Sequence, residues 1–286
     1  MGEGRFLLEC HALFSRRHER VPGRSQTSSH RSLKGGGTPI NTPESRLPAP
    51  PVNDAGLDVS RIRAITLDLD DTLWPIWPTI TRAEGRLQAW LDQHAPATAA
   101  LGRDRNTLRE ARNQMATMRP DLALDMSGLR RESIRWLLQR AGEDPALAEP
   151  AFEVFFAERH RVVLFEDALP ALEFLASRFP VVALSNGNAD VHRVGIGAHF
   201  HASLNAGAFG VGKPDVRIFH AAAQAAGVDA SQVLHIGDDA HLDGVGALNA
   251  GMQLAWVNRE GQAWDHAPLA PHITVSELLA LCRALG

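Results

Sequence analysis

The stretch Ile62-Arg-Ala-Ile-Thr-Leu-Asp-Leu-Asp-Asp-Thr-Leu73 decides the fold. Its first half, Ile62 to Leu69, is a short apolar run rich in β-favouring residues, as expected for a buried parallel strand. Residues i and i+2 of a strand point the same way, so Asp68 and Asp70 are placed to present two carboxylates to one site. For an isolated pair of this kind, capping of a following helix by Asp70 or Asp71 is the simpler interpretation. The rest of the chain must decide between the two.

Further strand-like runs occur later in the chain, and helical patterns alternate with them. The runs are Pro180–Leu184, Gln232–Ile236, Leu254–Val257 and, more weakly, Ala202–Ala208; the helical patterns are Ala168–Phe179 and Asp215–Ala226. Polar residues follow the ends of the runs. This alternation predicts an α/β fold with a doubly wound, Rossmann-like parallel sheet and a ligand at its carboxyl edge.

The segment from 75 to 165 contains no strand-like run and is expected to be helical. The candidate helices are a segment starting at the capping box Thr81–Glu84, then Arg105–Met118, Leu129–Ala141 and Leu147–Val162. We therefore expect an inserted α-helical cap at 75–165 and an α/β core at 61–74 and 166–286.

The N-terminal stretch differs in composition from the rest. Residues 1–50 hold eight basic and four acidic residues, and Ser, Thr, Gly and Pro are frequent from Ser25 to Pro51. Such a segment buries too little apolar surface to fold, so residues 1–60 are predicted to be a disordered basic extension. A targeting segment and an over-extended start are the alternatives.

Composition excludes several classes of protein. The 286 residues carry a formal net charge of −4, which gives no reason to expect a nucleic-acid partner. The two cysteines, Cys10 and Cys282, are too few for a disulfide framework or a cysteine zinc site. No apolar run approaches the roughly 20 residues of a membrane span. We expect a cytoplasmic monomer or dimer that acts on a small molecule.

A second acidic cluster follows another predicted strand. Asp238, Asp239 and Asp243 come after Gln232–Ile236, and if they meet the first cluster their repulsion must be neutralised by a cation. Oxygen ligands favour Mg²⁺ over Zn²⁺. A metal with spare carboxylates suggests phosphate chemistry.

Groups that bind phosphate are expected near such a site. Ser185 and Asn186 end one strand, and Lys213 precedes a helix; an ordinary turn and a solvated charge are the simpler interpretations. After residue 50, however, the chain uses 20 Arg and one Lys, namely Lys213. An ammonium that must touch both a carboxylate and a phosphoryl oxygen is not easily replaced by the flat guanidinium fork.

Two competing motifs fail on detail. Gly207 to Lys213 matches a phosphate-binding loop, but Pro214 stands where Ser or Thr should hold Mg²⁺ and keeps Lys213 out of a helix. Gly244-Val-Gly246 begins a dinucleotide fingerprint, but Asn249 replaces its third glycine.

Four segments together resemble the motifs of the haloacid dehalogenase superfamily over about residues 61–286. They are Asp68-Leu-Asp-Asp-Thr-Leu73, Ser185-Asn186, Gly212-Lys-Pro214 and Gly237-Asp-Asp239 followed by Asp243. The insert resembles that family's type-1 cap. Ala64–Leu73, Ser185–Ala189 and Leu234–Met252 are especially similar to bacterial phosphatases for flavin mononucleotide and for 5-amino-6-(5-phospho-D-ribitylamino)uracil, a riboflavin precursor.

The resemblance implies a Mg²⁺-dependent phosphomonoester hydrolase. In that family Asp68 would be the nucleophile that forms an aspartyl-phosphate, and Asp70 the general acid and base. Asp68, the Asp70 carbonyl and Asp238 would bind Mg²⁺, with Asp239 or Asp243 orienting metal-bound water. Ser185, Asn186 and Lys213 would hold the phosphoryl oxygens.

Asp70 also separates subfamilies, because dehalogenases lack an acid/base Asp there and the transport ATPases carry Thr. A phosphomutase, or a phosphatase for sugar phosphates or phosphoglycolate, remains an alternative. A receiver-like phospho-acceptor module is a distant one, because its hydroxyl residue and Lys follow all its acidic residues. Trp74, Trp77 and Asn188 are candidate substrate contacts, against packing at the cap hinge for the tryptophans and an ordinary turn for Asn188.

Overall fold

The structure is a computed structural model that describes residues 56–103 and 105–286. The disorder predicted for residues 1–60 therefore falls almost entirely outside the described residues. Asp58, at the start of the described part, already contacts the core. Its backbone N–H donates to Gln253 Oε1 (2.8 Å), and Gln253 Nε2 donates to the Asp58 carbonyl (3.0 Å). Asp58, within the segment predicted to be disordered, is therefore tied to the core by two hydrogen bonds.

The core contains one parallel sheet of six strands in the order β3-β2-β1-β4-β5-β6. The strands are β1 (Ala64–Leu67), β2 (Val181–Ser185), β3 (Ala202–Asn205), β4 (Val233–Gly237), β5 (Gln253–Val257) and β6 (Ile273–Val275). The order reverses direction at β1, which pairs with β2 on one side and β4 on the other. The predicted doubly wound fold is confirmed, and β1 lies at the switch point where such sheets bind ligands.

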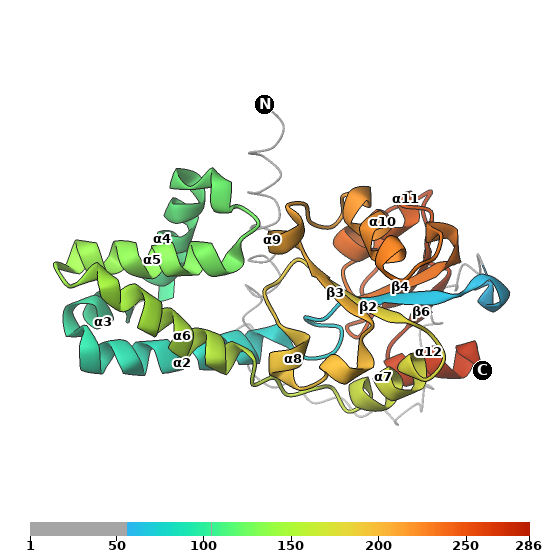
Figure 1. The fold of residues 1–286 in the computed structure, drawn as a ribbon, viewed down its shortest axis with the longest axis horizontal. Coiled ribbons are helices and arrows are strands. Elements are labelled where there is room, and N and C mark those ends of the chain that lie inside the picture. Colours follow the sequence, from blue (N-terminus) through green and yellow to red (C-terminus); the bar gives the residue numbers. More distant parts are fainter. Residues whose placement is uncertain (1–55, 104) are drawn as a thin grey trace, which may run out of the picture. The chain divides into compact units, whose positions relative to one another are not determined.

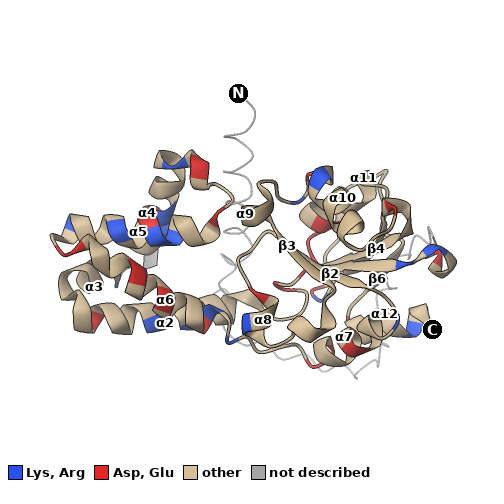
Figure 2. Ribbon diagram, viewed as in Figure 1, with Lys and Arg blue, Asp and Glu red and all other residues tan. Residues whose placement is uncertain are grey.

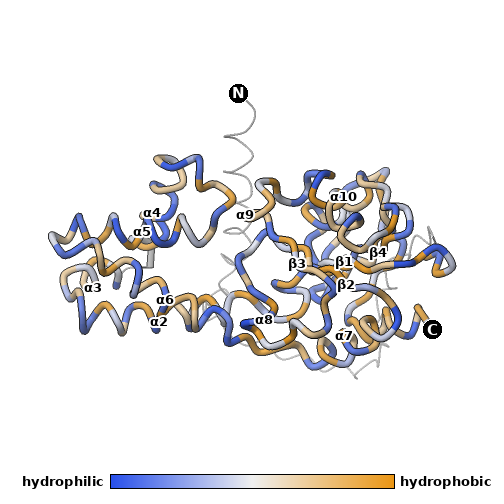
Figure 3. The backbone as a smooth tube through the Cα atoms, in the orientation of Figure 1, coloured by the Kyte–Doolittle hydropathy of each residue, from blue (hydrophilic) through white to orange (hydrophobic). Residues whose placement is uncertain are grey.

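Helices cover both faces of the sheet (Figure 1). Ile65 and Leu67 of β1 pack with α7 (Ala168–Ala176), α8 (Val191–Val194) and α12 (Leu278–Leu285). Ala64, on the opposite face, packs with α10 (Val216–Ala225) and α11 (Gly246–Asn249). Both faces are apolar because both are buried, and the hydrophobic colour of the strands in Figure 3 follows from this.

A set of helices occupies the chain between β1 and α7. They are α2 (Ile76–His94), α3 (Pro96–Gly102), α4 (Arg105–Met118), α5 (Met126–Ala141) and α6 (Ala148–Arg159). We call Ile76–Arg159 the helical insert. It has an apolar cluster of its own, which includes Leu87, Leu138 and Phe152. Charged residues lie along its helices (Figure 2).

The insert leaves and rejoins the core at adjacent points. The backbone N–H of Phe165, after α6, donates to the carbonyl of Leu73, before α2, at 2.9 Å. The two connections therefore run side by side, and the long insert does not separate β1 from the strands that follow.

The predicted start of the first insert helix is wrong. Thr81–Glu84 is not a capping box, because α2 already begins at Ile76. Pro78 is compatible with this start because the first-turn N–H groups of a helix have no intrahelical partner. The side chain of Asp71 accepts from the N–H of Ile76 (2.9 Å) and takes the capping role instead.

The weak strand predicted at Ala202–Ala208 is too long. β3 ends at Asn205, whose side chain accepts from the N–H of Ala208 (2.9 Å) and caps the short helix α9 (Ala206–Phe209). α3, β6 and α12 were not anticipated. The remaining short helices are η1 (Val59–Arg61), η2 (Pro120–Leu122), η3 (Pro145–Leu147), η4 (Gly197–His199), η5 (Ala230–Gln232) and η6 (Ala240–Val245). Within residues 56–103 and 105–286, no helix has the length and apolarity to cross a membrane.

Candidate active site

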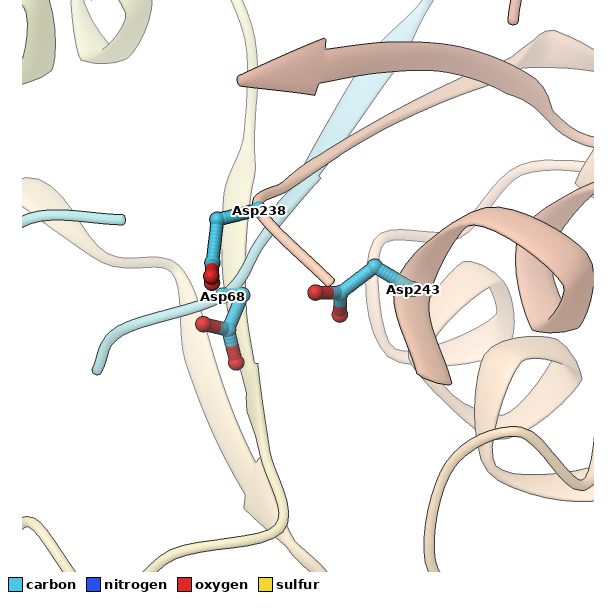
Figure 4. A group of neighbouring side chains, drawn as sticks. All are labelled: Asp68, Asp238 and Asp243. Atoms are coloured by element: carbon cyan, nitrogen blue, oxygen red, sulfur yellow. The ribbon is translucent and has the colours of Figure 1, made fainter. Parts of the chain in front are cut away.

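The carboxyl ends of three adjacent strands bring the predicted site residues together. Asp68 follows β1, Ser185 ends β2, and Asp238 follows β4. Carboxylate oxygens of Asp68, Asp238 and Asp243 lie within 4.8 Å of one another. Figure 4 shows the three side chains turned toward a shared space, with Asp243 reaching it from η6, the turn of π-helix after β4. The two acidic clusters of the sequence therefore form one.

Lys213 lies between two of these carboxylates. Its Nζ donates to Asp68 Oδ1 and to Asp243 Oδ1, each at 2.5 Å, and the residue is only 3% exposed. Asp68 and Asp243 are likewise buried. A buried ammonium needs this kind of ionic pairing, and its point charge serves two acceptors that diverge in direction.

Burial and neighbouring charges compete in setting the ionisation of these three groups. It raises the pKa of Asp68 to about 8, although Lys213 acts in the opposite direction, and the charge of Asp243 raises the pKa further. Burial also opposes ionisation of Asp243, but Lys213 and the hydrogen bond from His235 outweigh it and lower its pKa. For Lys213, the two carboxylates outweigh burial and raise the pKa. At neutral pH we take Lys213 and Asp243 as charged. For Asp68, the positive charge of Lys213 does not offset burial and the negative charge of Asp243.

Asp243 is held by a buried hydrogen-bond chain. Its Oδ1 lies 3.1 Å from His235 Nε2, and His235 Nδ1 lies 2.9 Å from Thr66 Oγ1. Burial lowers the pKa of His235, so the imidazole is neutral. The carboxylate accepts only, which assigns the proton to Nε2 and makes Nδ1 the acceptor for the Thr66 hydroxyl. His235, inside β4, thus supports the site through Asp243.

Asp239 and Asp243, the two candidates for orienting metal-bound water, differ in their surroundings. Asp239 Oδ1 accepts from the N–H groups of His241 and Leu242 (2.9 and 2.8 Å) and so caps η6. Asp243 Oδ2 accepts from the N–H of Asp239 (3.0 Å). Of the two residues proposed to orient metal-bound water, Asp243 is the one that belongs to the carboxylate cluster.

The turn after β2 organises the phosphate-binding candidates. Asn186 pairs with the backbone of Lys213 through both atoms of its amide: Oδ1 accepts from the Lys213 N–H (2.7 Å), and Nδ2 donates to the Lys213 carbonyl (2.8 Å). Ser185 Oγ accepts from the N–H of Gly187 (2.9 Å). The Asn186 side chain therefore positions Lys213. In the role predicted for Asn186, its backbone N–H would donate to a phosphoryl oxygen.

Asp70 has two donors of its own. Trp74 Nε1 donates to Asp70 Oδ1 (2.8 Å), and Arg159 Nη2 donates to both carboxylate oxygens (2.8 Å each). Asp71, in contrast, caps α2 with its side chain and adopts a φ of 60°, a left-handed conformation that Asp tolerates better than most residues. Asp71 therefore caps the following helix, whereas the side chain of Asp70 contacts Trp74 and Arg159.

The three candidate substrate contacts have different environments. Trp74 is completely buried in the core, so its ring faces contact protein and its N–H serves Asp70; this favours the packing interpretation. Trp77 is half-buried in the first turn of α2. Asn188 is half-buried, and its Nδ2 donates to Ser127 Oγ at the start of α5 (3.1 Å), which joins the phosphate turn to the helical insert.

Sequence analysis does not identify Arg159 or Thr66 as site residues. Arg159 is one of 27 arginines and ends an amphipathic helix, where an exposed side chain is the usual expectation. Thr66 lies inside a strand. Only tertiary contact distinguishes them.

The residues of the cluster fit a hard dication. The cluster contains three carboxylates and one ammonium, that of Lys213, which contacts Asp68 and Asp243. The donor set of the three carboxylates contains only oxygen, and burial raises the pKa of Asp68. A divalent cation would supply the missing positive charge, and oxygen donors suit Mg²⁺.

Comparisons with known proteins agree with this chemistry. Residues 62–251 match the family model described as haloacid dehalogenase-like hydrolase. The chain is 32% identical over 231 residues to the 5-amino-6-(5-phospho-D-ribitylamino)uracil phosphatase YigB of Escherichia coli, covering 78% of this chain and 96% of that protein. It is 34% identical over 155 residues to the phosphoserine phosphatase of Thermus thermophilus, covering 52% of this chain and 62% of the relative.

A solved structure shares the fold closely. It is described as a 2-haloacid dehalogenase from Pseudomonas syringae, with a TM-score of 0.72 and 39% sequence identity over 78% of this chain and 98% of that one. The chain is thus similar both to proteins named as phosphatases and to a protein named as a dehalogenase.

Proposed function

The chain belongs to the haloacid dehalogenase-like hydrolase family and is a phosphatase, and we propose that it hydrolyses small phosphomonoesters through a phosphorylated Asp68. The observation that carries the mechanism is the convergence of Asp68, Asp70, Ser185 and Lys213 beyond β1 and β2. Each residue offers a different part of phosphoryl transfer: a nucleophile, an acid, a hydroxyl donor and a cation.

The first step forms a bond between Asp68 and phosphorus. A carboxylate oxygen of Asp68 attacks the phosphorus atom, and the bond from phosphorus to the ester oxygen breaks. Asp70 gives its proton to that oxygen, so the alcohol leaves uncharged. Lys213 remains beside Asp68 and balances charge on the phosphoryl group.

The second step regenerates Asp68. Asp70, now a carboxylate, takes a proton from water as the water oxygen attacks phosphorus. The bond from phosphorus to Asp68 breaks, and inorganic phosphate leaves. Ser185 Oγ and the Asn186 N–H would donate to the non-bridging oxygens in both steps, which keeps the group fixed while its partners change.

The Asp68 and Asp238 carboxylates and the Asp70 carbonyl would hold Mg²⁺, with Asp243 alongside. When bound, the ion supplies positive charge that offsets the repulsion between Asp68 and an anionic phosphate. We further propose that the helical insert acts as the cap that selects the leaving group, with Trp77 and Asn188 on its side of the site.

The name of the Escherichia coli relative supports 5-amino-6-(5-phospho-D-ribitylamino)uracil as the substrate, and flavin mononucleotide is a second candidate that we propose from the motifs of the sequence. A sugar phosphate, phosphoglycolate or a mutase reaction is the alternative within the same site. The proposal includes a cytoplasmic location and a monomer or dimer that needs no nucleic acid or membrane. Asp70 argues against haloacid dehalogenation, because that reaction has no leaving alcohol to protonate.

A substrate panel tests the proposal. Phosphate release is measured with Mg²⁺ from flavin mononucleotide, the ribityl precursor, phosphoserine and sugar phosphates, and halide release from a 2-haloacid. We expect phosphate release from at least one ester, loss with EDTA, recovery with Mg²⁺, and no halide release. Unchanged turnover in EDTA contradicts the metal, and halide release contradicts the phosphatase.

The covalent step needs a separate measurement. Beryllium fluoride, which mimics a phosphoryl group on a carboxylate, should inhibit the wild type and bind it. Asp68→Asn should abolish both turnover and this binding. Binding that survives the substitution would place the nucleophile elsewhere.

A further inference from the structure

Arg159 is the last residue of α6 and reaches the catalytic loop from the helical insert. Its Nη2 donates to Asp70 Oδ1 and Oδ2 at 2.8 Å, across 89 positions of sequence. The residue is 1% exposed, so the contact is not a solvated surface ion pair. By contrast, the side chain of Arg161, two residues on, is 71% exposed and lies 3.4 Å from Glu158.

Burying this guanidinium is costly for folding. Its Nη1 is buried and, in the part of the chain that the structure describes, has no hydrogen-bond partner. An unsatisfied buried donor destabilises a folded protein. The benefit of placing Arg159 here is therefore sought in the contact that its Nη2 makes with Asp70.

The two oxygens of Asp70 have different surroundings. Oδ1 accepts from two donors, Trp74 Nε1 and Arg159 Nη2, whereas Oδ2 accepts from Arg159 alone. The position that a Cβ atom would take on Gly187 lies 2.6 Å from Asp70 Oδ2, 3.3 Å from Ser185 Oγ and 3.7 Å from Arg159 Nη2. Oδ2 is therefore the oxygen on the side of the phosphate turn.

We propose that Arg159 is a positioning residue that orients Asp70, so that Oδ2 carries the proton given to the leaving oxygen. This inference rests on the proposed function, because it assumes that Asp70 is the general acid. Trp74 and Arg159 hold Oδ1 from two directions, and the carboxyl group cannot turn Oδ2 away from Ser185.

The proton inventory is consistent with this arrangement. When Asp70 is a carboxylate, Arg159 Nη2 donates to both oxygens, as the structure has it. When Oδ2 carries the proton, the same nitrogen donates to Oδ1 alone, and the O–H of Oδ2 is directed at the ester oxygen. Proton transfer to that oxygen restores the carboxylate and the two-oxygen contact, ready for the hydrolytic water.

The test compares leaving groups that differ in their need for a proton. p-Nitrophenolate leaves without protonation, whereas an alkoxide does not. We expect Arg159→Met to lower kcat/KM for an alkyl phosphomonoester from the panel by about 100-fold, at the lower end of general acid contributions. The value for p-nitrophenyl phosphate should fall by less than about 5-fold, and Arg159→Lys should restore part of the alkyl activity.

Two controls and one replacement variant keep the possible outcomes distinct. Arg161→Met, the exposed neighbour, should leave both substrates unchanged. Beryllium fluoride binding to Asp68 should survive in Arg159→Met, because it needs no acid. If Arg159→Met fails to fold, Trp74→Phe removes the other donor to Oδ1 and should show the same selective loss on alkyl esters, to a smaller degree.

The outcomes also separate this inference from the proposed function. Asp70→Asn should show the same selective loss as Arg159→Met, and a larger one. Equal losses on both substrates in Arg159→Met, or none, overturn the positioning role while Asp70 keeps its own. A uniform loss in Asp70→Asn overturns the acid role itself.

Discussion

The two halves of the site are built from different parts of the chain. On the Asp68 side, the supporting residues all belong to the α/β core and are buried; they are Thr66, Lys213, His235 and Asp243. On the Asp70 side, one of the two donors is Arg159, at the end of the helical insert. The proposed nucleophile, Asp68, is thus held by residues of the core, whereas the proposed acid, Asp70, also depends on a residue of the helical insert.

The two steps of the proposed reaction therefore depend on different parts of the chain. Attack on phosphorus is the same for every phosphomonoester, and the groups that support it are local to the strand ends. Protonation depends on the leaving group, and its support comes from the element that would contact that group. Experiments that disturb one half and spare the other test the division.

The largest expected effect is on the nucleophile side. Lys213→Arg should lower kcat by about 10²–10³-fold while the protein folds normally, because a planar fork cannot replace an ammonium bonded to Asp68 and Asp243 in a buried space. Alkyl and p-nitrophenyl esters should lose activity equally. The exposed substitution Arg217→Lys is the control, and near-full turnover in Lys213→Arg would show that the point charge is dispensable.

A smaller effect is expected when the acid side is disturbed more than the nucleophile side. Gly187→Ala places a methyl group 2.6 Å from Asp70 Oδ2, so the carboxyl group must shift. We expect a loss of about 10–100-fold on alkyl esters and a much smaller loss on p-nitrophenyl phosphate. Gly85→Ala, on α2 with open space around it, is the matched control. Equal losses on both esters would mean that the two halves are not separable.

The smallest effect concerns stability without metal. Burial raises the pKa of Asp68 in the folded protein to about 8, far above its ordinary value of 3.8. The folded state therefore holds a proton that the unfolded state releases between about pH 4 and pH 8, and stability falls as pH rises through this window. In EDTA, Asp68→Asn should remove this fall, so that the variant has a higher Tm than the wild type at pH 8.

Thermal unfolding at several pH values measures this difference. The two proteins should be closest in stability near pH 4, and added Mg²⁺ should reverse their order at pH 8, because ligand binding stabilises only the protein that binds it. A wild type that is the more stable at pH 8 in EDTA would show that Lys213 fully compensates Asp68.

The nucleophile half could be predicted from the sequence because its residues directly follow buried strands. Apolar runs ending in Asp68, Ser185 and Asp238 indicate a parallel sheet, and parallel strands place their carboxyl ends at one edge. The unusual use of Lys213 among arginines pointed to the same place. These signals are local, and the topology of the sheet brings them together.

The other half could not be predicted in this way. Whether Asp70 or Asp71 caps α2 is decided by the backbone conformation of the loop, and either residue type suits the role. Arg159 contacts Asp70 only because the insert folds back on itself, which no spacing in the sequence encodes. The start of α2 was wrongly predicted for the same reason. The helix is capped by Asp71, which lies outside it, and not by Thr81.

The hydrogen bond from Phe165 to Leu73 closes the insert into a loop whose ends meet at one point. Because its two ends are adjacent, the insert could be exchanged for a segment of another length without changing the order of the strands. We call such an exchangeable segment a cassette. Such an exchange would leave Lys213 and Asp68 in place and would remove Arg159. A grafted cassette must therefore bring its own donor for Asp70, so new substrate specificity is acquired together with a new way of holding the acid.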